Sequence, residues 1–121
     1  MTRKLGAVLL VAMAAGLMGT GPAAAWVLEP GPEIQDRLQE ALILAKPGDV
    51  IELEEGLYEF VGSLSLDVDN VTLRGRGMDK TVLSFKKQDA GSEGLIVTSS
   101  GVTLQDFAVE DTIGDAIKVK G

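Results

Sequence analysis

The chain has 121 residues, with 18 acidic and 11 basic side chains, a formal charge of −7, and no Cys or His. This length allows one domain at most, and the missing residue types exclude a disulfide framework, a thiolate nucleophile, a Ser-His-Asp triad and metal sites built from Cys or His. The acidic balance argues against a nucleic-acid partner, which requires a basic surface. Carboxylate, Lys, Arg and Tyr side chains remain for any chemistry.

Residues 1–25 have the pattern of a secretory signal peptide. Arg3 and Lys4 precede an uncharged apolar run from Leu5 to Met18, and a small-residue Ala-x-Ala site ends at Ala25. A membrane anchor is the alternative, but the run would span about 21 Å as a helix, short of the roughly 30 Å hydrocarbon core of a bilayer. We therefore predict cleavage after Ala25 and a secreted or periplasmic protein without a membrane segment.

Residues 26–48 are expected to hold a connecting segment and then a helix. Two prolines and a glycine in 26–32 indicate turns, whereas 33–45 place apolar side chains at helical spacing. Lys46-Pro47-Gly48 should end the helix, because a residue before proline disfavours the helical conformation. The apolar stripe consists of Ile34, Leu38, Ala41, Leu42 and Ala45. We expect this helix to pack on its own domain, with a partner-binding amphipathic helix as the alternative.

From Asp49 onward the apolar period changes to two, which is typical of strands. Residues 86–94 are polar and contain glycine, so they are expected to form a longer surface loop. Short strands are predicted at 49–54, 57–60, 64–66, 71–73, 81–85, 95–97, 102–104, 107–109 and 116–119.

An internal repeat relates residues 64–73 to residues 95–104. The alignment matches Asn70 with Gly101, two residue types that tolerate positive φ. A weaker, shorter repeat would align Val97 with Ile117. The aligned pairs are Leu64 with Leu95, Leu66 with Val97, Val71 with Val102, Thr72 with Thr103, and Leu73 with Leu104. The repeat favours coils stacked on one another over an antiparallel sandwich, because two-residue Asn-Gly or Asp-Gly hairpins are absent.

Residues 35–60, which end in PGDVIELEEGLYEF, resemble the N-terminal start of right-handed parallel β-helix proteins of the pectin-lyase-like superfamily. In that pattern a short helix covers the open first coil, and a Pro-Gly-Asp turn, a strand and a Gly-x-Tyr turn follow. Residues 70–83 look like the first complete coil of this family, and residues 101–107 look like the second. The resemblance implies an all-β, right-handed parallel β-helix, with a capping helix in 26–48 and two to three coils in 49–121.

The same resemblance implies a carbohydrate-active protein. The superfamily includes polysaccharide lyases, hydrolases and epimerases, but also β-helix repeat proteins without assigned activity, so a polysaccharide partner is expected and a non-enzymatic periplasmic accessory or surface scaffold is the alternative. Catalytic groups in the family usually lie on middle coils, and no catalytic residue is assigned here. Because family members are longer and no C-terminal cap is recognisable, we expect this chain to be an N-terminal portion of such a protein.

Several side chains are candidates for binding or catalysis. Arg74 and Arg76 could bind a uronate carboxylate, and Asp67 and Asp69 could form a hydrolytic carboxylate pair, although both pairs also fit ordinary turns. Tyr58 is expected to pack within its turn motif. Ca²⁺ is the one cofactor considered, because it prefers several carboxylate and carbonyl oxygens. Its candidate ligands, which could equally be solvated turn residues, are Asp106, Glu110, Asp111 and Asp115.

Overall fold

The computed structural model describes residues 25–120, so the predicted signal peptide lies outside the described residues apart from Ala25. This part of the chain contains one helix, α2 (Ile34–Leu44), and ten short strands. The strands are β1 (Ala25–Leu28), β2 (Val50–Leu53), β3 (Gly56–Glu59), β4 (Gly62–Leu66), β5 (Thr72–Arg74), β6 (Thr81–Ser84), β7 (Ala90–Val97), β8 (Thr103–Gln105), β9 (Ala108–Glu110) and β10 (Ile117–Val119).

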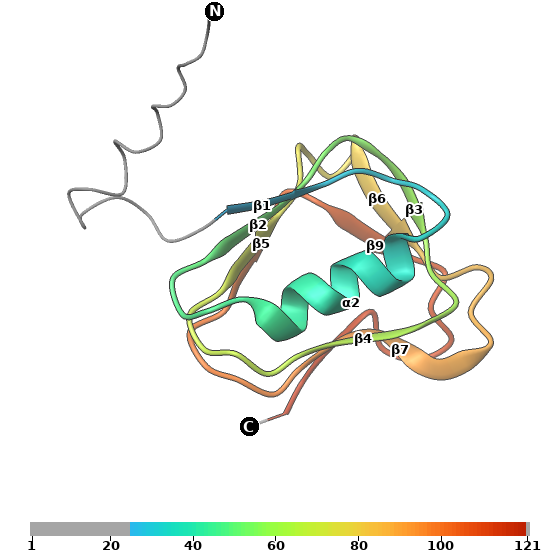
Figure 1. Ribbon diagram of the computed structural model, residues 1–121. Helices are drawn as coiled ribbons and strands as arrows, with labels where there is room; N and C mark the ends of the chain where they lie inside the picture. Colours follow the sequence, from blue (N-terminus) through green and yellow to red (C-terminus); the bar gives the residue numbers. More distant parts are fainter. Residues whose placement is uncertain (1–24, 121) are drawn as a thin grey trace, which may run out of the picture.

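The strands form three parallel sheets that enclose a roughly triangular space (Figure 1). The sheet orders are β1-β2-β5-β8, β3-β6-β9 and β4-β7-β10, and each strand pair within the described residues runs parallel. Successive strands belong to different sheets, so the chain winds through three coils: β2-β3-β4, β5-β6-β7 and β8-β9-β10. The predicted all-β parallel β-helix is therefore confirmed, and the antiparallel sandwich is excluded.

The repeat found in the sequence is the stacking register of successive coils, because it aligns β4 and β5 with β7 and β8. Leu64 pairs with Leu95 and Leu73 pairs with Leu104, as the alignment predicts. Asn70 and Gly101 turn the same corner in successive coils with φ values of 60° and 71°. A Cβ atom at Gly101 would collide with the Asn70 side chain, so both the backbone conformation and the close stacking favour glycine there.

The weaker alignment of Val97 with Ile117 is wrong. Ile117 pairs with Leu95, and Val97 pairs with Val119. Both registers place an apolar residue on the inner face, so the apolar pattern alone does not separate them; the close backbone pairing of β7 with β10 decides between them.

Two segments are more regular than expected. The residues predicted as a turn-rich connection begin with β1, in which Trp26 pairs with Ile51 of β2. The loop predicted over 86–94 is shorter, because β7 begins at Ala90 and pairs with Gly62 across a register shift. In both cases the neighbouring strand provides backbone hydrogen-bonding partners that a local reading of turn residues does not reveal.

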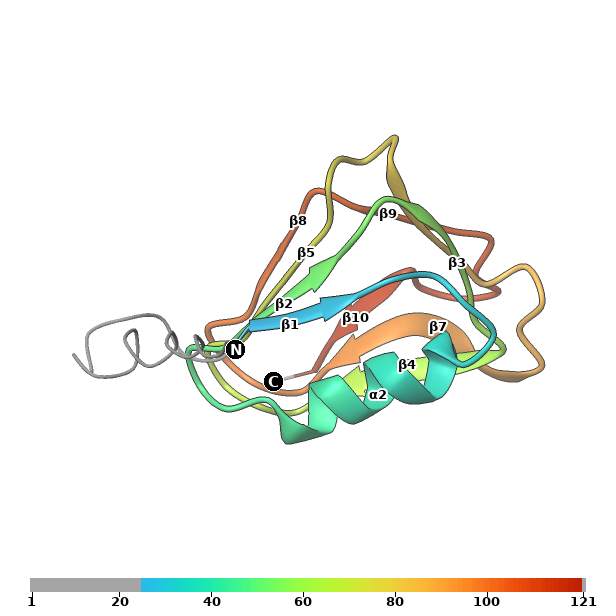
Figure 2. The ribbon, with the colours of Figure 1, turned by 45° about the horizontal axis from the view of Figure 1, so that its top comes forward.

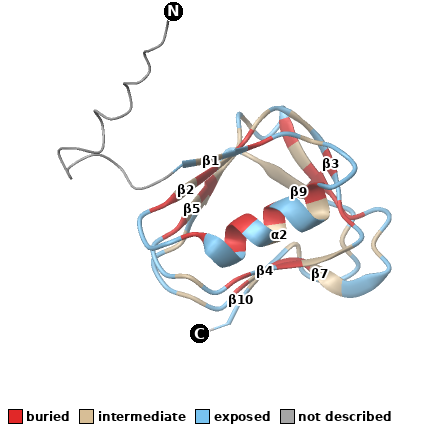
Figure 3. Cartoon of the chain, in the orientation of Figure 1, coloured by how far each residue is buried: buried red, intermediate tan, exposed pale blue. Residues whose placement is uncertain are grey.

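The helix covers one end of the coil stack, as the sequence predicts. α2 contacts β1, β3 and β4, and lies across the opening of the triangle in Figures 1 and 2. Its predicted apolar stripe is buried against the inward side chains of the first coil, and Figure 3 shows the buried helix face turned toward the sheets. Covering the apolar end of a repeat stack is a requirement for solubility, and α2 meets it at this end.

Side-chain amides of α2 also satisfy the free edge of β4. Gln35 accepts hydrogen bonds from the backbone N–H groups of Val61 (2.9 Å) and Gly62 (3.1 Å) and donates one to the Gly62 carbonyl (3.3 Å). Gln39 accepts from Ser65 N–H (2.9 Å) and donates to the Ser65 carbonyl (3.0 Å). The Gln35/Gln39 amide pair thus takes the place of a neighbouring strand for part of β4, a device that protects a sheet edge from unwanted pairing.

The turn between α2 and β2 is held by a buried carboxylate. Asp49 is almost completely buried and accepts a hydrogen bond from the Lys46 N–H at 2.9 Å. The indole Nε1 of Trp26 donates to the same carboxylate at 3.4 Å. A buried polar group requires such partners, so Asp49 connects the helix end, β1 and the first coil.

Candidate functional site

Stacked ion pairs lie on the outer face of the sheet formed by β1, β2, β5 and β8. Glu52 of β2 and Arg74 of β5 occupy the same register position, and Arg74 Nε donates to Glu52 Oε2 at 3.0 Å, with a second contact from its terminal nitrogen. Arg76 donates to Glu54 at 3.2 and 2.9 Å and lies 3.7 Å from Glu52. We call these four residues the Glu/Arg ladder.

The electrostatics of the Glu/Arg ladder follow from these contacts. The hydrogen bond from Arg74 lowers the pKa of Glu52, and the two arginine charges act in the same direction against partial desolvation. The hydrogen bond to Glu54 raises the pKa of Arg76. Both shifts favour the charged forms of Glu52 and Arg76.

The structure brings Arg74 and Arg76 together, as the uronate-binding hypothesis requires, but in company with two carboxylates. The sequence alone does not pair the two arginines with Glu52 and Glu54, because these glutamates precede them by a whole coil. A uronate would have to share these guanidinium groups with Glu52 and Glu54. A neutral sugar could bind beside the ion pairs, since the pairs leave polar atoms partly exposed.

Asp67 and Asp69 hold turns together. The Thr98 hydroxyl donates to Asp67 Oδ1 at 2.7 Å, and the Ser100 N–H donates to Asp69 Oδ1 at 2.9 Å. Both contacts join the turn after β4 to the corresponding turn of the next coil. The turn interpretation of this pair accounts for these hydrogen bonds, and each carboxylate has a separate partner.

The four acidic candidates for Ca²⁺ are all exposed. Three of them contribute backbone carbonyls to coil stacking: Asp106 accepts from Gly77, Glu110 from Phe85 and Asp115 from Gly94. Within residues 25–120, no three acidic side chains gather closely enough to hold a metal ion.

Tyr58 lies in the core, as expected from its turn motif. Its side chain is completely buried, and its hydroxyl lies 2.6 Å from the Glu54 carbonyl and 3.0 Å from the Leu28 carbonyl. Burial raises the pKa of Tyr58 to about 12, with a smaller contribution from the Glu54 charge. The phenol is neutral at physiological pH and links β1 to the first coil.

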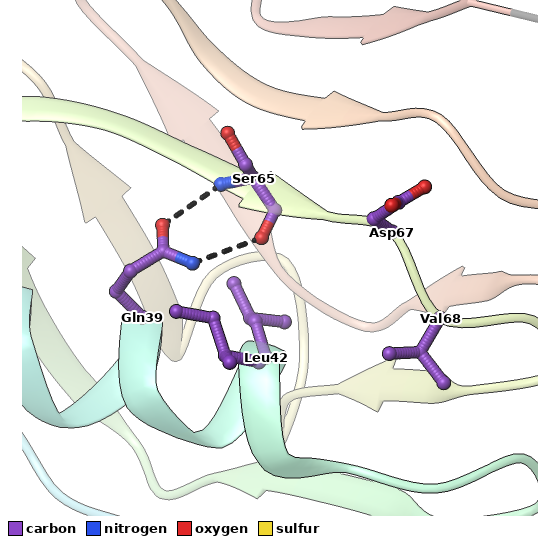
Figure 4. A pocket seen from close by; sticks show the side chains of 6 residues that line it. Gln39, Leu42, Ser65, Asp67 and Val68 are labelled. Carbon is purple, nitrogen blue, oxygen red and sulfur yellow. Dashed lines mark hydrogen bonds between the residues drawn. The ribbon is translucent and has the colours of Figure 1, made fainter.

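A groove between α2 and β4, which the sequence analysis did not identify, has a volume of about 530 Å³. In Figure 4 the Gln39 amide is bonded to the backbone of Ser65, and the Leu42, Asp67 and Val68 side chains lie nearby. The α2–β4 groove is lined by Gln39, Leu42, Ile43, Ser65, Asp67 and Val68. One sequence signal pointed to this region: Ile43 and Leu44 are apolar but lie off the stripe that packs on the core.

Comparisons with family models, curated proteins and solved structures found no match to this chain. The assignment as a parallel β-helix therefore depends on the strand pairing itself. Of the helices in residues 25–120, none is long and apolar enough to cross a bilayer.

Proposed function

We propose that this chain forms capped coils of an exported, carbohydrate-active parallel β-helix protein of the pectin-lyase-like superfamily. In this proposal the coils contribute a saccharide-contacting face, and the reacting groups of a lyase, epimerase or hydrolase are not among them. The observation that carries the proposal is the Glu/Arg ladder on the outer face of β2 and β5, next to the exposed amide of Gln105 on β8.

The ladder suits an extended sugar chain for a geometric reason. Strands in a sheet lie about 4.8 Å apart, so Glu52, Arg74 and Gln105 form a row of polar side chains across three coils. Planar guanidinium, carboxylate and amide groups can each form two directed hydrogen bonds to neighbouring hydroxyls. The ion pairs hold these groups in place before any sugar arrives, which reduces the entropy cost of binding.

A non-enzymatic accessory or surface scaffold is the second candidate. The pairing of the arginines favours the scaffold, because Arg74 and Arg76 already bind carboxylates of the same chain. The separate engagement of Asp67 and Asp69 in turns favours it as well. The two candidates differ in whether the ladder binds saccharides.

The experiment titrates oligogalacturonate and a neutral oligosaccharide separately into the full chain and follows backbone amide NMR shifts. We expect shifts concentrated at Glu52, Arg74 and Gln105, and at least a fivefold weaker affinity in the Arg74→Gln/Arg76→Gln variant. The matched control is Lys87→Gln/Lys118→Gln, which removes two cations paired with acids on the other sheets.

Each outcome separates the candidates. Unchanged spectra with both sugars would support the scaffold, and equal loss in the control variant would reduce the effect to net charge. Release of shortened or unsaturated sugar products would contradict the proposal that the reacting groups lie outside these coils. For export, N-terminal sequencing of the exported protein should begin at Trp26, and a retained Met1 would contradict signal cleavage.

A further inference from the structure

The α2–β4 groove continues onto the outer side of the helix. A second depression of about 400 Å³ shares Gln39 and Ile43 with the groove and is lined by Asp36, Gln39, Glu40, Ile43 and Leu44. The two hollows therefore form one surface that runs along α2 from Asp36 to Leu44.

The centre of this surface is apolar and exposed. The Ile43 side chain is 64% exposed and that of Leu44 is 53% exposed, whereas the buried stripe of α2 does not include either residue. Single exposed apolar residues are common on proteins, but two neighbouring ones beside a hollow that contains Leu42 and Val68 form a contiguous patch. Burying such a patch is favourable because it removes apolar surface from water.

The charged side chains that line this surface are all acidic. Asp36, Glu40 and Asp67 line the two hollows, and no Lys or Arg is among the lining residues. The last turn of α2 also contains no basic residue, and the helix C-terminus itself carries partial negative charge. An occupant that fits must combine apolar side chains with positive charge.

The wall of the groove is formed in advance. Gln39 uses both ends of its amide to bind the Ser65 backbone, which holds the helix and β4 at a set separation (Figure 4). A site that does not have to be ordered on binding loses less affinity to conformational entropy.

We propose that the α2–β4 groove, with Ile43 and Leu44, docks a short segment of a partner protein in which apolar side chains are flanked by Lys or Arg. The charge argues against the other occupants. A second copy would bring Asp36 and Glu40 toward a like-charged surface, and an anionic lipid surface would be repelled in the same way. The proposal is independent of saccharide binding, which is assigned to a different face.

The test measures fluorescence anisotropy of a labelled amphipathic peptide of Leu and Lys with the full chain, against a matched peptide of Leu and Glu. We expect the Lys peptide to bind at least tenfold more tightly and its affinity to fall with added salt, because screening weakens the charge contribution. The Ile43→Ser/Leu44→Ser variant should bind at least tenfold more weakly than the unmodified chain.

Two control variants test whether binding of the peptide depends on the groove or on nonspecific apolar contacts and net charge. Leu57→Ser/Val61→Ser removes apolar side chains that are 54% and 45% exposed on another face, and it should leave affinity unchanged. Asp36→Asn/Glu40→Gln should weaken binding about fivefold and flatten the salt dependence, whereas Glu55→Gln/Asp89→Asn, an equal charge change at exposed positions outside the groove, should not. Thermal unfolding of every variant checks that the fold is retained.

Several results would overturn the proposal. These are tighter binding of the Leu and Glu peptide, equal effects of groove and control variants, or unchanged affinity in the Ile43→Ser/Leu44→Ser variant. Sedimentation showing a dimer that this variant dissociates would assign the surface to a second copy. Binding to phosphatidylglycerol vesicles through Ile43 and Leu44 would assign it to a membrane.

Discussion

The first and last coils each contribute one strand to every sheet but differ in their degree of burial. In the column Leu66, Val97 and Val119, which stacks one residue from each coil, the exposed fraction rises from 0% to 3% and then to 69%. The column of Leu64, Leu95 and Ile117 shows the same trend. Figure 3 shows the buried colour on α2 and the early coils, whereas β10 is largely exposed.

The burial of an inward-facing apolar side chain therefore depends on the position of its coil in the stack. Each coil contacts only the coils beside it, so an inward apolar residue is enclosed when it has a neighbour on both sides. At the first coil α2 and β1 provide that neighbour. Within residues 25–120, β8, β9 and β10 are each the last strand of their sheet. Substitutions near the capped first coil and in the last coil should therefore differ in their cost to the free energy of unfolding.

The cap should contribute far more to stability than the last coil. Leu38→Ala removes a fully buried side chain from the inner face of α2, and we expect it to lower the free energy of unfolding by about 2–5 kcal/mol. Urea denaturation of the full chain measures this loss.

A matched pair in one column isolates the effect of position. Val97→Ala and Val119→Ala are the same substitution at adjacent stacked positions, and we expect losses of about 1–2 kcal/mol and less than about 0.5 kcal/mol respectively. Equal losses at the two sites would refute the argument that the stack determines burial.

Alkaline pH should weaken the capped end through Tyr58. The folded-state pKa of about 12 lies above the unfolded value near 10, so the unfolded chain loses its proton first as pH rises. The stabilisation is complete below pH 10 and is lost between pH 10 and 12, by about 2–3 kcal/mol.

Unfolding of the native chain and of Tyr58→Phe between pH 8 and 12 provides the measurement. Tyr58→Phe should be less stable by about 1–2 kcal/mol at pH 8, because two buried carbonyls lose their shared hydroxyl donor. The gap between the two proteins should close between pH 10 and 12 and then reverse in sign, because the native chain loses about 2–3 kcal/mol over this range and Tyr58→Phe does not. A gap independent of pH would show that the phenol ionises equally in both states.

The Gln35/Gln39 amide pair should protect the edge of β4, whereas within residues 25–120 no side chain hydrogen-bonds to the backbone of β8. We expect Gln35→Ala and Gln39→Ala each to cost about 1 kcal/mol and to speed hydrogen exchange at the amides of Gly62 and Ser65. The control is Gln105→Ala on β8, which should change stability by less than about 0.5 kcal/mol. Unaltered exchange in both glutamine variants would contradict the role of a substitute strand.

The smallest effect is expected from the Glu/Arg ladder. Because the folded-state pKa of Glu52 is lowered, its stabilisation is present above the unfolded value of 4.5 and is lost as pH falls below it. Glu52→Gln should therefore cost about 1 kcal/mol or less at pH 7, since the partners are partly exposed, and its cost should fall as the pH drops below 4.5. Glu59→Gln, which removes a more exposed pair with Lys87, should cost less at pH 7.

Most of the fold could be predicted because apolar spacing and coil stacking agree. Leu64 and Leu95 align in sequence and pair in space, and the stripe from Ile34 to Leu42 covers the first coil as expected. β1 was missed because two prolines and a glycine follow it closely, and its strand conformation depends on pairing with β2. The position of Ile117 was misjudged because both registers satisfy the same apolar pattern.

The candidate sites were less predictable, because they depend on partners from other coils. Arg74 was recognised as a candidate, but Glu52 lies one coil earlier and nothing local connects the two. The α2–β4 groove depends on Gln39 meeting Ser65, a contact between a helix and a strand whose residues lie 26 positions apart in the chain. Asp67 and Asp69 were considered both as a carboxylate pair and as turn residues, and their hydrogen bonds to the stacked turn agree with the second alternative, which their residue types already favour.

The amino-acid sequence by itself determined the strand period, the capping helix and the repeat of the parallel coils, because these depend on the spacing of apolar side chains along the chain. The tertiary structure alone decided which charges neutralise each other, which strand edges are protected by Gln35 and Gln39, and where a groove remains. Those features arise from contacts between coils, and such contacts exist only after the chain has closed each turn of the stack.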